Sequence, residues 1–305
     1  MDTNRFKLPS LNAFKAFHAV ARHGSVSGAA DELSVTPQAV SQQVKLLEDT
    51  LKVTLFERRG RSIESTETAV LLARFVEAGF EEMAEGVRRV TRQRCRDRIN
   101  LNVSPYFATR YLLPRLSGFR GFQPQSDLRM TTMVETPDFE RDDIDVAVQW
   151  GYGDWGNLEA NLLLKDPKVI CCTPELAVRV KSRQDLAGQR LLHPVLKNSL
   201  WSDILEFLDV QVPDDASELA FHDAETMRCA TLSGMGIGLI SRVDAEHDTL
   251  AGDLVAPLGV DALRDLPPEK VPGFYLVLPR AHRRITWIES FCDRVTGQNW
   301  ENATE

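Results

Sequence analysis

The sequence has few cysteines and none of the arrangements that build disulfide frameworks or zinc sites. Its five cysteines are scattered, form no CxxC pair and stand at no ligand spacing with histidine. An odd, dispersed set of this kind indicates free thiols in a reducing compartment. Adjacent Cys171 and Cys172 are expected to be small core residues. We expect no metal and no cofactor.

Long apolar runs are also missing. No stretch of about 18 apolar residues occurs, so no membrane-spanning helix is expected. The first residues, MDTNRFKLPSLNAFKAF, lack the apolar segment of an export signal. We therefore expect a cytoplasmic protein without a membrane partner. With 305 residues, 43% of them hydrophobic, the chain is expected to form two or three globular domains.

Catalytic motifs are absent from the sequence. Gly234, Gly236 and Gly238 form Gly-x-Gly repeats, but they precede a strand, whereas phosphate-binding loops follow one and open a helix. There is no Ser–His–Asp order, HExxH or P-loop, and the six histidines are isolated. Ordinary structural roles are expected for them, and we expect the protein not to be an enzyme.

Charge is distributed unevenly along the chain, whose net charge is −8. Residues 1–98 hold 16 Lys and Arg against 13 Asp and Glu, whereas the remainder holds 20 against 31. A basic end on an acidic protein indicates that this end meets a polyanion.

Three short helices are expected in the first segment. Apolar residues recur at helical spacing from Leu11 to Val20, and His23-Gly24 ends that helix. Ser25 or Ser27 can cap a short second helix. Thr36 and Pro37 suit the cap and first position of a third helix, whose core side would carry Val40, Val44, Leu47 and Leu51.

The opposite side of the third helix carries Gln38, Ser41, Gln42 and Lys45. A helix, a short turn and a second helix form the geometry that places the second helix in the major groove of DNA. Glutamine can pair with adenine, and serine and lysine can hold bases or phosphates. An ordinary solvated polar face is the alternative.

The next segment favours the interpretation that the polar face of the third helix contacts DNA. Residues 55–66, LFERRGRSIEST, hold a Gly-centred turn with Arg58, Arg59 and Arg61 close together. This pattern predicts a short hairpin, or wing, whose guanidinium groups could reach phosphates or the minor groove.

One long helix is expected from Glu67 to about Arg94. Its apolar positions repeat almost as a heptad, which is typical of a helix paired with a second copy; they are Ala69, Leu72, Val76, Phe80, Met83, Val87 and Val90. The alternative is an amphipathic helix that docks on its own domain. Six arginines between Val87 and Arg98 could touch DNA or form a solvated linker.

Residues 8–67, together with 143–155 and 234–258, resemble the LysR-type transcriptional regulators, particularly the subgroup that contains the regulator of the glycine-cleavage operon. The resemblance implies an α/β multidomain fold: a winged helix-turn-helix, a dimerising linker helix and an effector domain like a periplasmic binding protein. It also implies a homotetramer that binds promoter DNA and a small molecule, with RNA polymerase as a further partner.

The resemblance implies that the family's DNA contacts fall on the helix-turn-helix and the wing of this sequence. The residues are Ser27, Thr36, Pro37, Gln38, Ser41, Gln42, Lys45, Arg58, Arg59 and Arg61. The sequence departs from the family pattern at Gly28, Gln42 and Ser65. Gly28 and Gln42 are expected to alter base preference or to weaken phosphate contact. Ser65 affects the position at which the wing ends and the linker helix begins.

From Ile99 onward, strand and helix patterns alternate as in α/β units. A helix is expected from Pro105 through Phe119, and residues 158–164 and 168–173 are expected to be crossover strands into another lobe. Ligands of open α/β sheets bind at the carboxyl ends of strands. Such positions, with two residues that the resemblance adds from the opposite lobe, give the predicted effector contacts: Ser104, Pro105, Thr131, Thr132, Trp150, Ser199, Trp201 and Asp223. Gln149 stands where the subgroup often has arginine, which leaves the charge of the effector open.

We expect a sequence-specific regulator with three parts, a DNA-binding domain at 1–66, a linker helix at 67–96 and an effector domain at 97–305. The last divides into subdomain I (97–165 and 271–305) and subdomain II (166–270). The alternative is a solute-binding protein of the transport type that uses the same α/β cleft; the basic front end argues against it.

Overall fold

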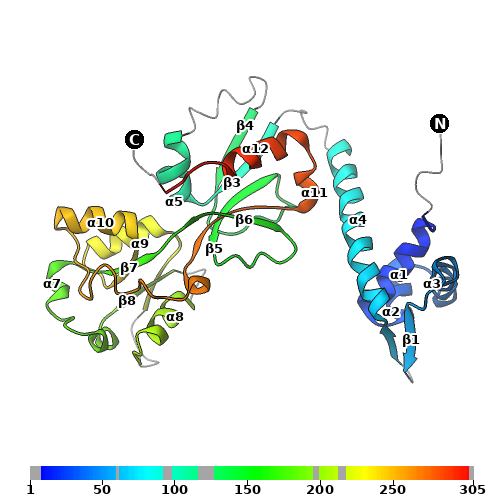
Figure 1. Ribbon diagram of the computed structural model, residues 1–305, viewed down its shortest axis with the longest axis horizontal. Helices are drawn as coiled ribbons and strands as arrows, with labels where there is room; N and C mark the ends of the chain where they lie inside the picture. Colours follow the sequence, from blue (N-terminus) through cyan, green and yellow to red (C-terminus); the bar gives the residue numbers. More distant parts are fainter. Residues whose placement is uncertain are drawn as a thin grey trace. The chain divides into compact units, whose positions relative to one another are not determined.

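The computed structural model describes residues 8–59, 62–91, 98–115, 127–194, 199–211 and 218–301. The chain divides into two compact units, Met1–Arg94 and Cys95–Glu305, which are described separately below (Figure 1). In these residues no helix combines the length and the apolar character that crossing a membrane requires.

The first unit consists of three short helices, a hairpin and a long helix. Its elements are α1 (Leu11–His23), α2 (Val26–Leu33), α3 (Pro37–Leu51), β1 (Phe56–Arg59), β2 (Ser62–Ser65) and α4 (Glu67–Thr91). The side chains of Ser10, Ser25 and Thr36 cap the three short helices by accepting backbone N–H groups, as capping residues do. Gly24, with φ 62°, ends α1.

Small residues allow the short helices to pack closely. Ala16 and Ala19 of α1 meet Ala29 and Ala30 of α2, and Val40 completes the same cluster from α3. A second cluster contains Ala13, Phe17, Leu47, Leu55 and Ala69. Leu51 was expected to face the core, but that prediction is wrong. It is the last residue of α3 and is 37% exposed.

The apolar positions that repeat along α4 lie in two different environments. Ala69 is buried, and Leu72 and Val76 pack in the second cluster of the same unit. Met83 and Val87 are 47% and 62% exposed. The alternative, docking on its own domain, therefore describes the first turns of α4. The side chain of Val90 lies outside the described residues.

The second unit has two lobes: lobe I is built around one five-stranded sheet and lobe II around two pairs of strands. The sheet of lobe I has the order β4-β3-β5-β11-β6, in which β3 runs parallel to β4 and β5, and β11 runs antiparallel to β5 and β6. The strands are β3 (Arg98–Val103), β4 (Asp127–Thr132), β5 (Val146–Gly151), β6 (Glu159–Lys165) and β11 (Gly273–Leu278).

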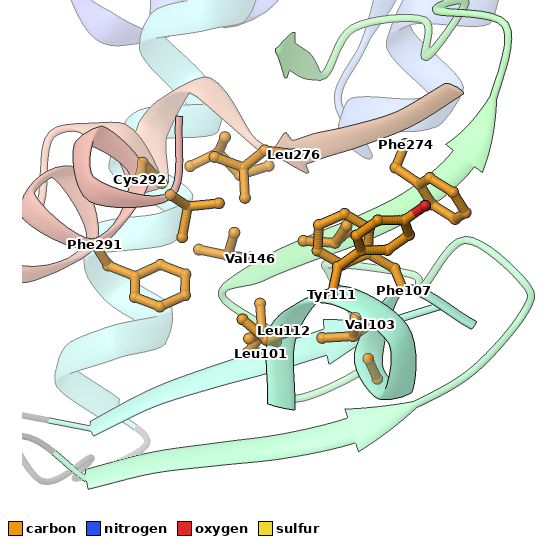
Figure 2. Close-up of a cluster of buried hydrophobic side chains, with 14 of the residues drawn as sticks. Leu101, Val103, Phe107, Tyr111, Leu112, Val146, Phe274, Leu276, Phe291 and Cys292 are labelled. Atoms are coloured by element: carbon orange, nitrogen blue, oxygen red, sulfur yellow. The ribbon is translucent and has the colours of Figure 1, made fainter. Parts of the chain in front are cut away.

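The core of lobe I lies between this sheet and its helices. Figure 2 shows Leu101 and Val146 facing Leu276, and Phe107 and Tyr111 gathered near Phe274. The helical segments are α5 (Pro105–Phe107), the π-helical turn η1 (Ala108–Leu112), α11 (Arg280–Arg283) and α12 (Thr286–Thr296). The helix expected through Phe119 is described as far as residue 115.

Lobe II joins two pairs of strands. β7 (Lys168–Cys171) pairs antiparallel with β10 (Gly238–Ser241), and β8 (Leu191–Pro194) pairs parallel with β9 (Glu218–Phe221). A bridge between Leu191 and Ile237 connects the pairs. The other elements are α7 (Pro174–Ala177), η2 (Arg183–Gly188), α8 (Ser199–Phe207), α9 (Ala224–Leu232), α10 (Arg242–Ala251) and η3 (Pro268–Lys270).

The chain passes between the lobes at two adjacent points. The first crossing, at Asp166 and Pro167, follows β6, and the return precedes β11. The N–H of Asp166 donates a hydrogen bond of 2.9 Å to the carbonyl of Pro272. β6, which was expected to lead into the other lobe, pairs with β11 in the sheet of lobe I and directly precedes the crossing. β7 is the first strand of lobe II.

Candidate nucleic-acid interface and ligand cleft

The outer face of α3 is exposed and polar. The Thr36 hydroxyl accepts a hydrogen bond of 3.2 Å from the N–H of Ala39, and Pro37 occupies the first turn. The side chains predicted to meet DNA are all exposed; they are Thr36, Pro37, Gln38, Ser41, Gln42 and Lys45. Because Val40 and Leu47 are buried on the opposite side, the helix presents one fixed face to solvent.

Close packing explains the glycine at the start of α2. A Cβ at Gly28 would lie 2.9 Å from the Oγ of Ser25 and 3.2 Å from the Cβ of His23. Ser25 uses that oxygen to cap α2 through the N–H of Gly28, at 3.1 Å. Ser27, which we predicted as a DNA contact, is exposed in the first turn of α2.

The wing is a two-stranded antiparallel hairpin in which Phe56 pairs with Ser65 and Arg59 with Ser62. Gly60 and Arg61 lie outside the described residues, as do the side chains of Arg58 and Arg59. The hairpin predicted from the sequence therefore forms. The positions of the three guanidinium groups of the wing lie outside the described structure.

A cavity of about 260 Å³ lies between the lobes of the second unit. Its apolar wall includes Pro105, Tyr106, Trp150, Trp155, Pro194, Leu200, Met227 and Phe274, and its polar groups are Ser104, Glu135, Thr136, Asp166, Lys168, His222 and Asp223. Ligand sites are commonly concave, mostly apolar and supplied with a few polar groups, and this cavity has that character.

Polar contacts join the lobes beside the cavity. Glu135 follows β4 in lobe I, and its Oε1 lies 2.5 Å from Nε2 of His222 in lobe II. The hydrogen bond from His222 lowers the pKa of Glu135. The hydroxyl of Tyr106 donates a bond of 2.6 Å to Asp244 of α10. Burial, reinforced by this carboxylate, raises the pKa of Tyr106.

A buried ion pair lies at the crossing between the lobes. Nζ of Lys168 lies 2.5 Å from Oδ2 of Asp166 and 2.9 Å from the hydroxyl of Ser241. Nε1 of Trp150 donates to the same carboxylate oxygen, at 2.7 Å. Both charged side chains are nearly inaccessible, with 4% and 5% exposed. Buried charges persist when they are paired and hydrogen-bonded in this way.

The predicted effector contacts divide into two groups. Ser104, Pro105, Trp150 and Asp223 line the cavity. Thr131, Thr132 and Trp201 are not among the residues that line it. Trp201 is fully buried and donates a bond of 2.8 Å to the carbonyl of Leu192.

Thr131 and Thr132 are the last residues of β4, and the Thr131 hydroxyl accepts a hydrogen bond of 3.3 Å from Nδ2 of Asn102. The side chain of Ser199 lies outside the described residues, although its neighbour Leu200 lines the cavity. Gln149 is also directed elsewhere, because its Nε2 donates to Oδ1 of Asn102, at 2.7 Å.

Sequence reasoning missed several lining residues, among them Glu135, Trp155, Asp166 and Lys168. One signal was available: Asp166 and Lys168 flank Pro167 between two apolar strands, where charged side chains are rarely buried without a partner. In the described part of the chain no group of three His, Cys, Asp or Glu side chains could hold a metal ion.

Two sequence families match the chain. Residues 11–70 match the family described as bacterial regulatory helix-turn-helix protein, lysR family. Residues 92–298 match the LysR substrate binding domain. The two matches correspond to the exposed α3 face with its hairpin and to the two-lobed unit with its cavity.

Two relatives cover nearly the whole chain. The glycine cleavage system transcriptional activator of Escherichia coli K12 is 33% identical over 288 residues, which span 93% of this chain and 92% of the relative. The transcriptional activator AmpR of Rhodobacter capsulatus is 32% identical over 291 residues, which span 95% and 98%.

Solved structures share the fold. The AmpR effector binding domain from Citrobacter freundii covers 66% of this chain and 97% of its own, with 20% identity and a TM-score of 0.55. The full-length Vibrio cholerae virulence activator AphB covers 95% and 100%, with 18% identity and a TM-score of 0.51.

Proposed function

Because the chain belongs to the LysR family of transcriptional regulators, we propose that α3 and the wing recognise one promoter sequence and that a ligand in the cleft controls this binding. Members of the family are regulators rather than enzymes. The alternative of a transport-type solute-binding protein is not favoured, because the same chain carries a helix-turn-helix domain.

The observation that carries this proposal is the exposed face of α3. Gln38, Ser41, Gln42 and Lys45 lie together on a helix whose other side is buried. Hydrogen-bonding side chains of this kind can contact base edges, and a basic end supplies phosphate contacts. The expected boundaries, 1–66, 67–96 and 97–305, assign DNA binding, pairing and ligand binding to successive segments.

We further propose that the protein acts in the cytoplasm as a dimer or tetramer. Val70, Leu71, Phe75, Met83 and Val87 are exposed apolar residues of α4, which supports pairing through this helix. A dimer would place two α3 helices on one duplex, which suits a palindromic site. RNA polymerase is proposed as a further partner at the promoter.

Selection from a random duplex pool tests the proposal. Full-length protein should enrich one motif with inverted half-sites. Binding to that motif should weaken steeply between 50 and 200 mM salt, by roughly 10³ to 10⁵ if about 6–10 phosphates are contacted. Failure to enrich any motif at low salt, with the fold verified by circular dichroism, contradicts sequence-specific binding.

A further inference from the structure

The charged side chains around the cavity favour one sign of ligand charge. Three carboxylates line it, from Glu135, Asp166 and Asp223, against one lysine, Lys168. Lys168 already pairs with Asp166 at 2.5 Å, so that pair contributes little net charge. Glu135 and Asp223 remain, and the imidazole of His222, the residue before Asp223 in sequence, contacts Glu135.

Both remaining carboxylates are ionised at neutral pH. The hydrogen bond from His222 lowers the pKa of Glu135. Burial raises the pKa of Asp223, but hydrogen bonds from the hydroxyl and backbone N–H of Thr226 outweigh burial and leave that pKa below its ordinary value. A protonated His222 would still leave one negative charge in excess.

Aromatic rings line the same cavity. Trp150, Trp155, Tyr106 and Phe274 all contribute to its wall. The faces of such rings attract cations, most strongly for tryptophan. The described wall of the cavity already contains such a contact, because Nζ of Lys168 lies 5.3 Å from the ring centroid of Trp150.

Ser104 places a hydroxyl group in the wall of the cavity. Its residue is only 7% exposed, and its hydroxyl makes no capping hydrogen bond at the start of α5. This hydroxyl lines the cavity, where a bound ligand could form a hydrogen bond with it.

An anionic ligand fits these groups poorly. Among the described lining residues, the one lysine, Lys168, already has a carboxylate partner in Asp166. An added carboxylate would therefore lie near Glu135 and Asp223 without a cation of its own, and like charges at close range repel each other.

We infer that the cleft selects a small ligand with a positively charged ammonium group, held by Glu135 and Asp223 against the tryptophan rings. The inference rests on the proposed function, in which this cleft is the effector site. It goes beyond that function by assigning the charge and chemical class of the effector, an organic amine or a zwitterion whose ammonium end is recognised here.

Three probes of similar size and different charge test the inference. They are 2-phenylethylamine, 2-phenylethanol and 3-phenylpropanoate, added at equal millimolar concentration to the full-length protein. All five tryptophans lie at or beyond residue 150, so thermal unfolding followed by tryptophan fluorescence reports the ligand-binding unit. The amine should raise the midpoint and bind about tenfold tighter than the alcohol, and the acid should have no effect.

Two variants locate the effect. Glu135→Gln keeps an acceptor for His222, and Asp223→Asn keeps a cap for α9, so both retain the local contacts while losing charge. Together they should abolish the preference for amine over alcohol. Glu175→Gln is the control, because Glu175 is exposed in α7 and does not line the cavity.

Equal binding of amine and alcohol, tighter binding of the acid, or no binding of any probe overturns the inference. Binding of the selected duplex is measured on the same preparations. If the unmodified protein binds the duplex but does not prefer the amine, only the proposed class of ligand is rejected. If the unmodified protein does not bind the duplex, the result counts against the proposed function.

Discussion

Glu48 of α3 holds the residue that leads into the wing: its Oε1 accepts hydrogen bonds from the backbone N–H groups of Leu55, at 2.7 Å, and Phe56, at 3.2 Å. One carboxylate thus fixes the start of β1 against the helix that carries the polar face. On the other side of the hairpin, the Thr66 hydroxyl donates to the carbonyl of Thr54, at 3.0 Å. The position of the wing therefore depends on a few polar contacts.

Removing the Glu48 carboxylate should destabilise the first unit alone. Glu48→Ala leaves two partly buried N–H groups without their acceptor, and such a loss typically costs about 1–3 kcal/mol. Urea unfolding should show an earlier helical transition by circular dichroism, whereas the tryptophan transition of the second unit stays unchanged. Asp49→Ala, at an exposed neighbour, is the control. A shift of the tryptophan transition alone would contradict this assignment.

Gln42 is predicted to read a base. Gln42→Ala should reduce discrimination between the selected duplex and random DNA by about 1–3 kcal/mol if the contact is bidentate. Arg59→Ala, in the wing, should weaken binding to both duplexes similarly, because phosphate contacts carry little sequence information. Fluorescence anisotropy at one fixed salt concentration measures both. If Gln42→Ala weakens both duplexes equally, Gln42 contacts the DNA backbone instead.

Phe75 and Val76 are neighbours with opposite environments. Phe75 is 72% exposed, whereas Val76 packs against the core cluster of Phe17 and Leu47. Phe75→Asp should lower the oligomer mass measured by light scattering while the helical signal persists. Val76→Asp should unfold the first unit, because it buries an unpaired charge. An unchanged mass for Phe75→Asp would exclude this face of α4 from the interface.

The local structure of the first unit could be predicted from sequence because short-range signals agreed there. Thr36 and Pro37 marked the start of α3, and Arg59-Gly60-Arg61 marked a turn; each depends on neighbours within a few residues. The partition of α4 could not be predicted in the same way. Its apolar spacing suits either an intramolecular core or a partner helix, and only the position of α1 decides between them.

The cleft shows a second limit. Trp150 of β5 lines the cavity, whereas Trp201 of α8 is a core residue. Alternation along a strand gives two faces but does not say which one meets the other lobe. Lys168 and Asp166 are two residues apart, and their pairing depends on the backbone conformation at Pro167, which sequence spacing alone does not specify.

The thiols provide a test of burial in the second unit. Cys171, Cys172 and Cys292 are buried, and burial raises their pKa values to about 12, 11 and 11. Because thiolates are the reactive form, these three should stay unreactive in the folded protein even when the pH rises from 7 to 9. Cys229 is exposed. In a Cys95→Ser background, which removes the thiol outside the described residues, a disulfide reagent should label one thiol rapidly and three more only on unfolding. Adding Cys229→Ser should abolish the rapid phase, and a rapid phase that survives this change would mean that the packing of β7 or α12 is looser than described.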